Sequence, residues 1–256
     1  MIKILSIAGS DPSGGAGIQI DLKTFQALGV YGMAVPAALT AQSSRSVNGT
    51  IPVAPRALSQ QIETLLSDIK PDAVKIGMVL TKGAVTIAAA AVRKYTIRNL
   101  VIDPVIRSSS GTMLLKPDAV RALKKDLFPL ALIITPNIPE AEALAGIAIR
   151  TDENMDFAAG KLLDMGPRYV LIKGGHRDSE VAVDTLYGGR TVLSFSTIRQ
   201  KGEFHGTGCV LSSAIAVFIG QGLPVEKAVE KAKLFVEKML KKAKRVGKEK
   251  TKYFQF

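Results

Sequence analysis

Short apolar segments rich in Ile and Val alternate with amphipathic helical patterns along most of the chain, and this alternation restricts the fold more than any other feature. Continuous apolar runs of this length are typical of strands that are buried on both faces. Because strands that alternate with helices usually pair in parallel, the pattern predicts an α/β fold. The predicted strands are Ile4–Ala8, Ala73–Gly77, Leu100–Asp103, Leu132–Thr135 and Tyr169–Lys173.

Helical periodicity fills most of the intervals between these strands. Helices are predicted at Pro55–Ile69, Gly83–Tyr95, Pro117–Leu127, Glu140–Leu144, Glu153–Met165, Thr207–Ile219 and Val225–Ala243. Two β segments around Gly188-Gly189, at 182–187 and 191–198, predict a hairpin. No linker, low-complexity stretch or internal repeat interrupts the pattern. We therefore expect residues 1–256 to form one domain, a three-layer α/β/α sandwich with a mostly parallel central sheet.

Charge and hydropathy limit which partners and which cellular compartment the chain can have. The net charge is +12, but half of it lies between residues 241 and 252, where seven Lys or Arg residues accompany one Glu. We expect residues 241–256 to form a basic C-terminal tail, a solvated helix end that binds no nucleic acid. No apolar stretch approaches the roughly 20 residues of a membrane-spanning helix, and the first residues predict a buried strand instead of a signal peptide. The single cysteine fits a reducing compartment, so we expect a cytoplasmic protein without membrane contact.

Glycine-rich segments stand at two points where a helix follows, and ligands of such sheets bind beyond the carboxyl ends of the strands. The segment 9–17 is neither a P-loop nor a complete G-x-G-x-x-G, so alone it indicates either ligand binding or a tight turn. The segment 206–209, Gly-Thr-Gly-Cys, opens a long apolar helix, and its N–H groups predict an anion hole. We expect the helix N-terminus to lower the pKa of the Cys209 thiol, which favours a functional role over that of an inert core cysteine.

Charged and amide side chains follow three of the predicted strands. Asp103 either holds a metal ion or caps the turn after its strand. Asn137 and Glu140 stand three residues apart at a helix start, where their oxygens either bind magnesium or cap the helix. Lys173 ends a buried strand, so its ammonium must reach solvent or an anion, and phosphate is the natural partner here.

Taken together and in this order, the motifs resemble those of the ribokinase-like superfamily, and most closely those of the hydroxymethylpyrimidine and phosphomethylpyrimidine kinases. The matching segments are 8–19 (AGSDPSGGAGIQ), 21–25 (DLKTF), 40–42 (TAQ), 72–78 (DAVKIGM), 103–105 (DPV), 135–137 (TPN), 173–176 (KGGH) and 205–209 (HGTGC). The resemblance implies a homodimeric enzyme of thiamin biosynthesis. It would use ATP and Mg²⁺ to phosphorylate 4-amino-5-hydroxymethyl-2-methylpyrimidine and then its monophosphate.

The resemblance also implies roles for individual residues. The implied substrate-binding positions are Gly9, Asp21, Gln42, Met78 and Val105; the ATP-binding positions are Asp103, Asn137, Glu140, Lys173 and Thr207; and the catalytic positions are Lys173, Gly206, Thr207, Gly208 and Cys209. Among these, Gln42 and Asp21 would read the pyrimidine edge and its amino group. Asp103 and Glu140 would be the magnesium ligands.

The sequence departs from the family pattern after residue 105, where a lysine is expected before a Ser-Gly pair. Here residues 106–111 read Ile-Arg-Ser-Ser-Ser-Gly, which leaves the local phosphate contacts open and makes Arg107 the candidate substitute. The two histidines, His176 and His205, have no Cys or His partner at metal spacing, so no zinc site is predicted.

Two other functions fit the same motifs. Some pyridoxal kinases share this scaffold and the cysteine, but Gln42 favours a pyrimidine because its amide can both donate to a ring nitrogen and accept from the neighbouring amino group. A non-catalytic pyrimidine-binding regulator would keep the pocket without turnover. The complete set of Lys173, Asn137, Glu140 and the Gly-Thr-Gly segment argues against that alternative.

Overall fold

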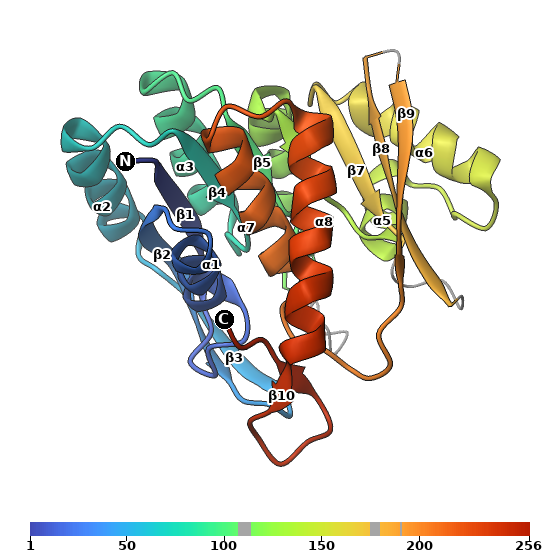
Figure 1. The fold of residues 1–256 in the computed structure, drawn as a ribbon. Coiled ribbons are helices and arrows are strands. Elements are labelled where there is room, and N and C mark those ends of the chain that lie inside the picture. Colours follow the sequence, from blue (N-terminus) through green and yellow to red (C-terminus); the bar gives the residue numbers. More distant parts are fainter. Residues whose placement is uncertain (107–113, 175–179, 190) are drawn as a thin grey trace.

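A nine-stranded sheet is the centre of the fold in the computed structural model, which describes residues 1–106, 114–174, 180–189 and 191–256 (Figure 1). In this part of the chain the strand order is β3-β2-β1-β4-β5-β6-β7-β8-β9. The strands are β1 (Lys3–Ser10), β2 (Tyr31–Gln42), β3 (Val47–Pro52), β4 (Ala73–Ile76), β5 (Leu100–Ile102), β6 (Ile133–Ile134), β7 (Tyr169–Lys173), β8 (Val181–Gly188) and β9 (Thr191–Ile198). Neighbours from β2 through β7 pair in parallel, whereas β3, β8 and β9 pair in antiparallel at the two edges.

Helices cover both faces of the sheet, and a buried apolar cluster lies on each side. One face carries α1 (Gly17–Ala27), α7 (Thr207–Gly220) and α8 (Val225–Lys242). The other carries α2 (Pro55–Asp68), α3 (Lys82–Lys94), α4 (Pro117–Ala122), the π-helical turn η1 (Leu123–Leu127), the 3-10 turn η2 (Phe128–Leu130), α5 (Ile138–Ala145) and α6 (Asp152–Leu163). The predicted α/β class and mostly parallel central sheet are thus confirmed.

The sequence analysis missed α1, β2 and β3. Helix α1 begins at Gly17 without a side-chain cap or an acidic residue in its first turn, so the usual signals of a helix start are absent. Strands β2 and β3 form a hairpin at the sheet edge that is exposed over much of its length, and continuous burial was the signal used for strands.

The parallel strands bring their carboxyl ends to one edge of the sheet, and the N-terminus of α7 meets them there. Gly9 lies near the end of β1, Asp103 follows β5, Asn137 follows β6 and Lys173 ends β7. Asn137 and Lys173 form a parallel β-bridge, which brings these two strand ends together. No helix within the described ranges is long and apolar enough to cross a membrane.

The basic tail differs from its prediction as a solvated helix end. Helix α8 stops at Lys242, and the chain then forms a small antiparallel hairpin of β10 (Lys244–Arg245) and β11 (Lys252–Tyr253). Its last residues return to the body of the protein, where Tyr253 and Phe254 are each 5% exposed. The apolar residues that follow the basic run supply the reason, because burying two aromatic side chains outweighs the solvation of the neighbouring lysines.

Candidate active site

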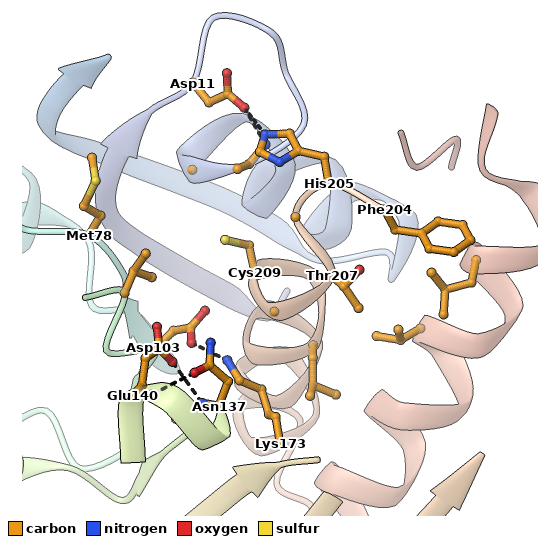
Figure 2. Close-up of a pocket in the computed structure, with 18 of the residues that line it drawn as sticks. Asp11, Met78, Asp103, Asn137, Glu140, Lys173, Phe204, His205, Thr207 and Cys209 are labelled. Carbon is orange, nitrogen blue, oxygen red and sulfur yellow. Dashed lines mark hydrogen bonds and ion pairs between the residues drawn. The ribbon is translucent and has the colours of Figure 1, made fainter. Parts of the chain in front are cut away.

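A cavity of about 710 Å³ opens at the carboxyl edge of the sheet and gathers nearly all of the site residues predicted from the sequence (Figure 2). One side is lined by Gly9, Gln42, Met78 and Val105, and the other by Asp103, Asn137, Glu140, Lys173, Gly206, Thr207, Gly208 and Cys209. Strand ends from β1, β5, β6 and β7 and the first turn of α7 therefore converge on one space. This is the place where ligands of open parallel sheets bind.

The first turn of α7 points its backbone N–H groups at this cavity. Gly206 caps the helix with φ of 81°, a left-handed conformation that favours glycine. A Cβ at this position would lie 1.9 Å from the Gly15 carbonyl oxygen, so the close approach of the two loops also requires glycine. The N–H groups of Thr207, Gly208 and Cys209 belong to the first turn, which α-helices leave without internal acceptors. The arrangement fits an anion.

Cys209 lies inside this turn, but the predicted decrease of its thiol pKa is wrong. Burial raises the pKa of the Cys209 thiol to about 11, although the Lys75 ammonium and a hydrogen bond from the Gly17 backbone act in the opposite direction. The negative charges of Asp21 and Asp103 raise it further. The error came from counting the helix N-terminus alone and omitting the cost of removing a thiolate from water.

Lys173 and Asp103 form a buried ion pair at the floor of the cavity. Lys173 Nζ lies 2.8 Å from Asp103 Oδ1, and the two side chains are 13% and 3% exposed. Thr135 donates to the same Asp103 oxygen at 3.2 Å, and Ser212 of α7 donates to the other at 3.3 Å. Although burial opposes ionisation, the ammonium groups of Lys173 and Lys75 keep the Asp103 pKa below its ordinary value. The carboxylate is therefore charged at neutral pH.

Asn137 and Glu140 form the capping box of α5, so the capping interpretation of this pair holds. The Asn137 side chain accepts the Glu140 N–H at 2.9 Å, and Glu140 Oε2 accepts the Asn137 N–H at 2.9 Å. Glu140 is 5% exposed, and burial raises its pKa to about 7, with Asp103 raising it and Lys173 lowering it. A buried carboxyl that lacks enough positive charge to ionise fully is a good partner for an added cation.

The predicted role of Asp21 is corrected by its position. Its side chain has no exposed surface, and both carboxylate oxygens are already bonded. Lys75 Nζ lies 3.0 and 2.8 Å from them, Ser6 donates at 2.6 Å and Ser213 donates at 2.8 Å. With these bonds in place, Asp21 has no free lone pair directed at the cavity. It supports the wall of the cavity through Lys75, which is itself fully buried directly behind that wall.

The opposite side of the cavity is close-packed around Gly9. A Cβ on Gly9 would lie 2.3 Å from Met78 Cε, so a larger residue there would displace the end of the Met78 side chain. Gln42 ends β2, and its amide nitrogen Nε2 lies 2.9 Å from His205 Nε2. His205 Nε2 also lies 2.9 Å from Asp11 Oδ2 (Figure 2). This side presents a flat amide, a thioether and backbone groups, which suits a small heteroaromatic ring.

Sequence reasoning missed three residues of this site. Asp11 and His205 line the cavity, and the fully buried Lys75 lies directly behind its wall. Lys75 lies in a predicted buried strand. Because a lysine is rarely buried without a charged partner, its position could have indicated a buried ion pair. His205 was judged only by metal spacing and not by its place beside the Gly-Thr-Gly segment. Arg107 and His176, to which the sequence analysis gave attention, fall outside the described residues.

Known proteins resemble this chain in both sequence and structure. Residues 11–253 match the sequence model of the family described as phosphomethylpyrimidine kinase. The hydroxymethylpyrimidine/phosphomethylpyrimidine kinase of Rhizobium meliloti is 44% identical over 244 residues, which cover 94% of this chain and 91% of that protein. The thiamine biosynthesis bifunctional protein ThiED of Geobacter sulfurreducens is 43% identical over 96% of this chain, but the chain spans only 50% of its length.

Among solved structures, an ADP complex of Bacillus subtilis pyridoxal kinase is 35% identical, with a TM-score of 0.91 over 100% of this chain and 97% of that one. The sheet order, the two helical layers and the cavity at the N-terminus of α7 define a ribokinase-like α/β kinase fold, as the resemblance implied. Within that class, the chain belongs to the phosphomethylpyrimidine kinase family.

Proposed function

We propose that the chain phosphorylates 4-amino-5-hydroxymethyl-2-methylpyrimidine with ATP and then phosphorylates the monophosphate to the diphosphate, as a step of thiamin biosynthesis. The observation that carries the proposal is the division of one cavity into two parts. Gln42, Met78 and Val105 supply a side for a small ring, and Lys173 with the first turn of α7 supplies a side for phosphate. Membership of the phosphomethylpyrimidine kinase family supports the same reaction.

The geometry supports catalysis by positioning and by charge. In the first transfer, the bond from the γ-phosphorus to the bridging oxygen breaks and a bond to the hydroxymethyl oxygen forms, with ADP leaving and the hydroxyl proton released to water. The N–H groups of Thr207, Gly208 and Cys209 would donate to the negatively charged oxygens of the transferred group, and Lys173 would add its ammonium. Cys209 would lie beside the attacking oxygen as a neutral thiol, because burial raises the pKa of its thiol to about 11.

Magnesium is the cation that the carboxyl groups of this site would accept. Asp103 and Glu140 supply two carboxyl groups next to the phosphate side, and Mg²⁺ bound to nucleotides usually takes one or two carboxylates together with phosphate oxygens and water. The pKa of Glu140, raised to about 7, fits a group whose charge would be compensated by the ion. When bound, magnesium would neutralise charge on the ATP phosphates.

Two further properties, the cellular location and the oligomeric state, are proposed. We propose a cytoplasmic location, which a single free cysteine supports.

We also propose a homodimer. Leu39 and Ile51 face each other across β2 and β3 and are 48% and 63% exposed, an apolar pair that a second copy would cover. The molar mass in solution from light scattering tests the dimer.

Pyridoxal kinase is the second candidate, and its structural likeness to this chain favours it. A coupled ADP-release assay with Mg-ATP separates the two functions when it offers hydroxymethylpyrimidine, its monophosphate and pyridoxal in parallel. Turnover of both pyrimidines with little on pyridoxal supports the proposal. Pyridoxal as the best substrate supports the alternative, and binding without turnover of any of the three supports a non-catalytic regulator.

A further inference from the structure

The chain end makes a contact that the proposed reaction does not explain. We call residues 243–256 the C-terminal arm. After α8 the arm turns through β10 and β11 and returns towards α1 and β2 (Figure 1). Lys252 N–H donates to the Glu203 carbonyl at 2.8 Å, and His205 N–H donates to the Lys252 carbonyl at 3.0 Å. The arm thus pairs as a strand with the segment that leads directly into the first turn of α7.

Tyr253 of the arm packs against the ring of His205. The two ring centroids are 5.4 Å apart at 63°, an edge-to-face contact, and Tyr253 is 5% exposed. Gly15 lies against both rings: a Cβ at this position would lie 2.3 Å from His205 Cδ2 and 2.4 Å from Tyr253 Cε1. Phe254, also 5% exposed, packs into the apolar cluster under α1, α7 and α8. The His205 ring is therefore held between two fixed surfaces.

His205 in turn determines which way the Gln42 amide faces. Hydrogen bonds from His205 and Ser13 hold the Asp11 pKa below its ordinary value despite burial, so the carboxylate accepts and the hydrogen lies on His205 Nε2. In the structure the amide nitrogen of Gln42 lies on that side, 2.9 Å from His205 Nε2, but a donor on Nε2 favours the flipped amide, with its oxygen there. In the flipped amide the nitrogen takes the place of Oε1, 3.3 Å from Thr40 Oγ1, which can accept because its own hydrogen is donated to the Ser10 carbonyl at 2.9 Å.

The unflipped amide leaves two conflicts. With its nitrogen towards His205, two N–H donors face each other, and Thr40 donates one hydrogen to two acceptors, Gln42 Oε1 and the Ser10 carbonyl. The flipped amide removes both conflicts and requires only that the His205 Nε2 hydrogen be shared between Asp11 Oδ2 and the Gln42 oxygen. In that orientation Gln42 keeps one N–H and one oxygen lone pair for a ligand. A ring nitrogen beside an amino group is the complement of this pattern.

We propose that Tyr253 is a positioning residue for substrate recognition: it holds His205 against Asp11, and His205 fixes the amide orientation with which Gln42 meets the substrate ring. The inference rests on the proposed function for the identity of that ring. It makes the C-terminal arm part of the selectivity for an aminopyrimidine over pyridoxal, whose ring lacks the adjacent amino group. The arm has no such role if it is a solvated helix end.

The test is steady-state kinetics of Tyr253→Ala with hydroxymethylpyrimidine, pyridoxal and ATP. We expect KM for the pyrimidine to rise about ten-fold, the change expected for one lost hydrogen bond. The kcat and the KM for ATP should change less than about two-fold, and the preference for the pyrimidine over pyridoxal should fall by the same ten-fold. Tyr253→Phe keeps the ring and should restore the wild-type values. Val246→Ala, at an exposed position of the arm, is the matched control.

A second variant approaches the same contact from the other side. Gly15→Ala leaves the arm intact but pushes a methyl group against both rings, so it should reproduce the rise in KM for the pyrimidine. Thermal unfolding of each variant separates this effect from loss of the fold, and the affinity for hydroxymethylpyrimidine is also measured by calorimetry.

An unchanged KM and affinity in both variants would overturn the inference, as would equal losses with every substrate. A wild-type chain that turns over no pyrimidine would instead contradict the proposed function. The calorimetric affinities would still test the inference in that case.

Discussion

Lys75 Nζ lies 3.0 and 2.8 Å from the two carboxylate oxygens of Asp21, and neither side chain has any exposed surface. Ser6 of β1 and Ser213 of α7 donate to the same carboxylate. The pair therefore joins β1, β4, α1 and α7 at one point. Because Ser213 follows Cys209 by one helical turn, this charged group lies directly below the proposed anion hole.

Breaking this pair should destabilise the protein strongly. Lys75→Met leaves the Asp21 carboxylate buried without a cation, and we expect the free energy of unfolding in urea to fall by about 3–5 kcal/mol. Lys75→Met combined with Asp21→Leu should recover part of that loss, because no charge is then left alone. Lys94→Met, which breaks the exposed pair with Glu63, is the control and should change stability little. Equal effects of the buried and exposed changes would contradict this account.

The Cys209 thiol should react as a weak acid. Its pKa is raised to about 11, chiefly by burial, so at neutral pH almost none of it is thiolate. The rate of alkylation by iodoacetamide should increase about ten-fold per pH unit from pH 7 to 10 without levelling. Glutathione, measured in parallel, should begin to level near its own thiol pKa of about 8.5–9. A plateau for the protein below pH 8 would show a thiolate and restore the expectation drawn from the helix N-terminus.

The raised pKa of Glu140 predicts that stability falls as pH rises, the reverse of the usual dependence for a carboxyl group. Its pKa is raised from 4.5 to about 7 in the folded protein, so between these values the folded state binds more protons than the unfolded state. Stability contributed by this group is therefore complete below pH 4.5 and is lost as pH rises towards about 7. Relative to Glu140→Gln, the metal-free wild type should become less stable over this interval, as measured by urea unfolding. A constant difference between the two proteins would contradict the raised pKa.

Substitution of Gly208 should lower activity without lowering stability. A Cβ at this position would lie 3.1 Å from Lys173 Nζ, which is held 2.8 Å from Asp103 Oδ1. Gly208→Ala should improve helix propensity but crowd the ammonium, so kcat should fall about ten-fold or more while Tm does not fall. Gly160→Ala in α6, where a Cβ meets no atom within 4 Å, is the control and should raise Tm with kcat unchanged. An unchanged kcat for Gly208→Ala would contradict the expectation that a Cβ at this position displaces the Lys173 ammonium.

Burial on both faces explains which parts of the fold the sequence could predict. The strands β1, β4, β5, β6 and β7 are buried over most of their length and mainly apolar, so each stood out as a short apolar run. Strand β3 has exposed residues along most of its length, and the apolar run at 33–39 in β2 is interrupted by Pro36, a residue that argues against a central strand. The return of the arm depends on Tyr253 and Phe254 finding a cavity made by distant segments. That contact spans more than 200 residues, from Gly15 to Tyr253, and no local pattern encodes it.

The residues of the site were also predicted only in part from the sequence. Motifs identified the residues that line the cavity, because glycines and charged groups at strand ends are local features. Their partners were not local: Asp21 is tied to Lys75 and Ser213, and His205 is tied to Asp11. These contacts join residues 54 to 194 positions apart, and they decided whether each group faces the ligand or supports the wall. The Cys209 pKa was mispredicted for the same reason, since burial is a property of the assembled fold.

The central claim is that one cavity performs two successive phosphoryl transfers on a pyrimidine. Mass spectrometry of a single reaction with hydroxymethylpyrimidine and excess Mg-ATP tests it directly. We predict that the monophosphate rises first, that it is then converted to the diphosphate, and that two ADP form for each pyrimidine consumed. A reaction that consumes no pyrimidine while pyridoxal is phosphorylated, or one that stops at the monophosphate, would contradict the claim.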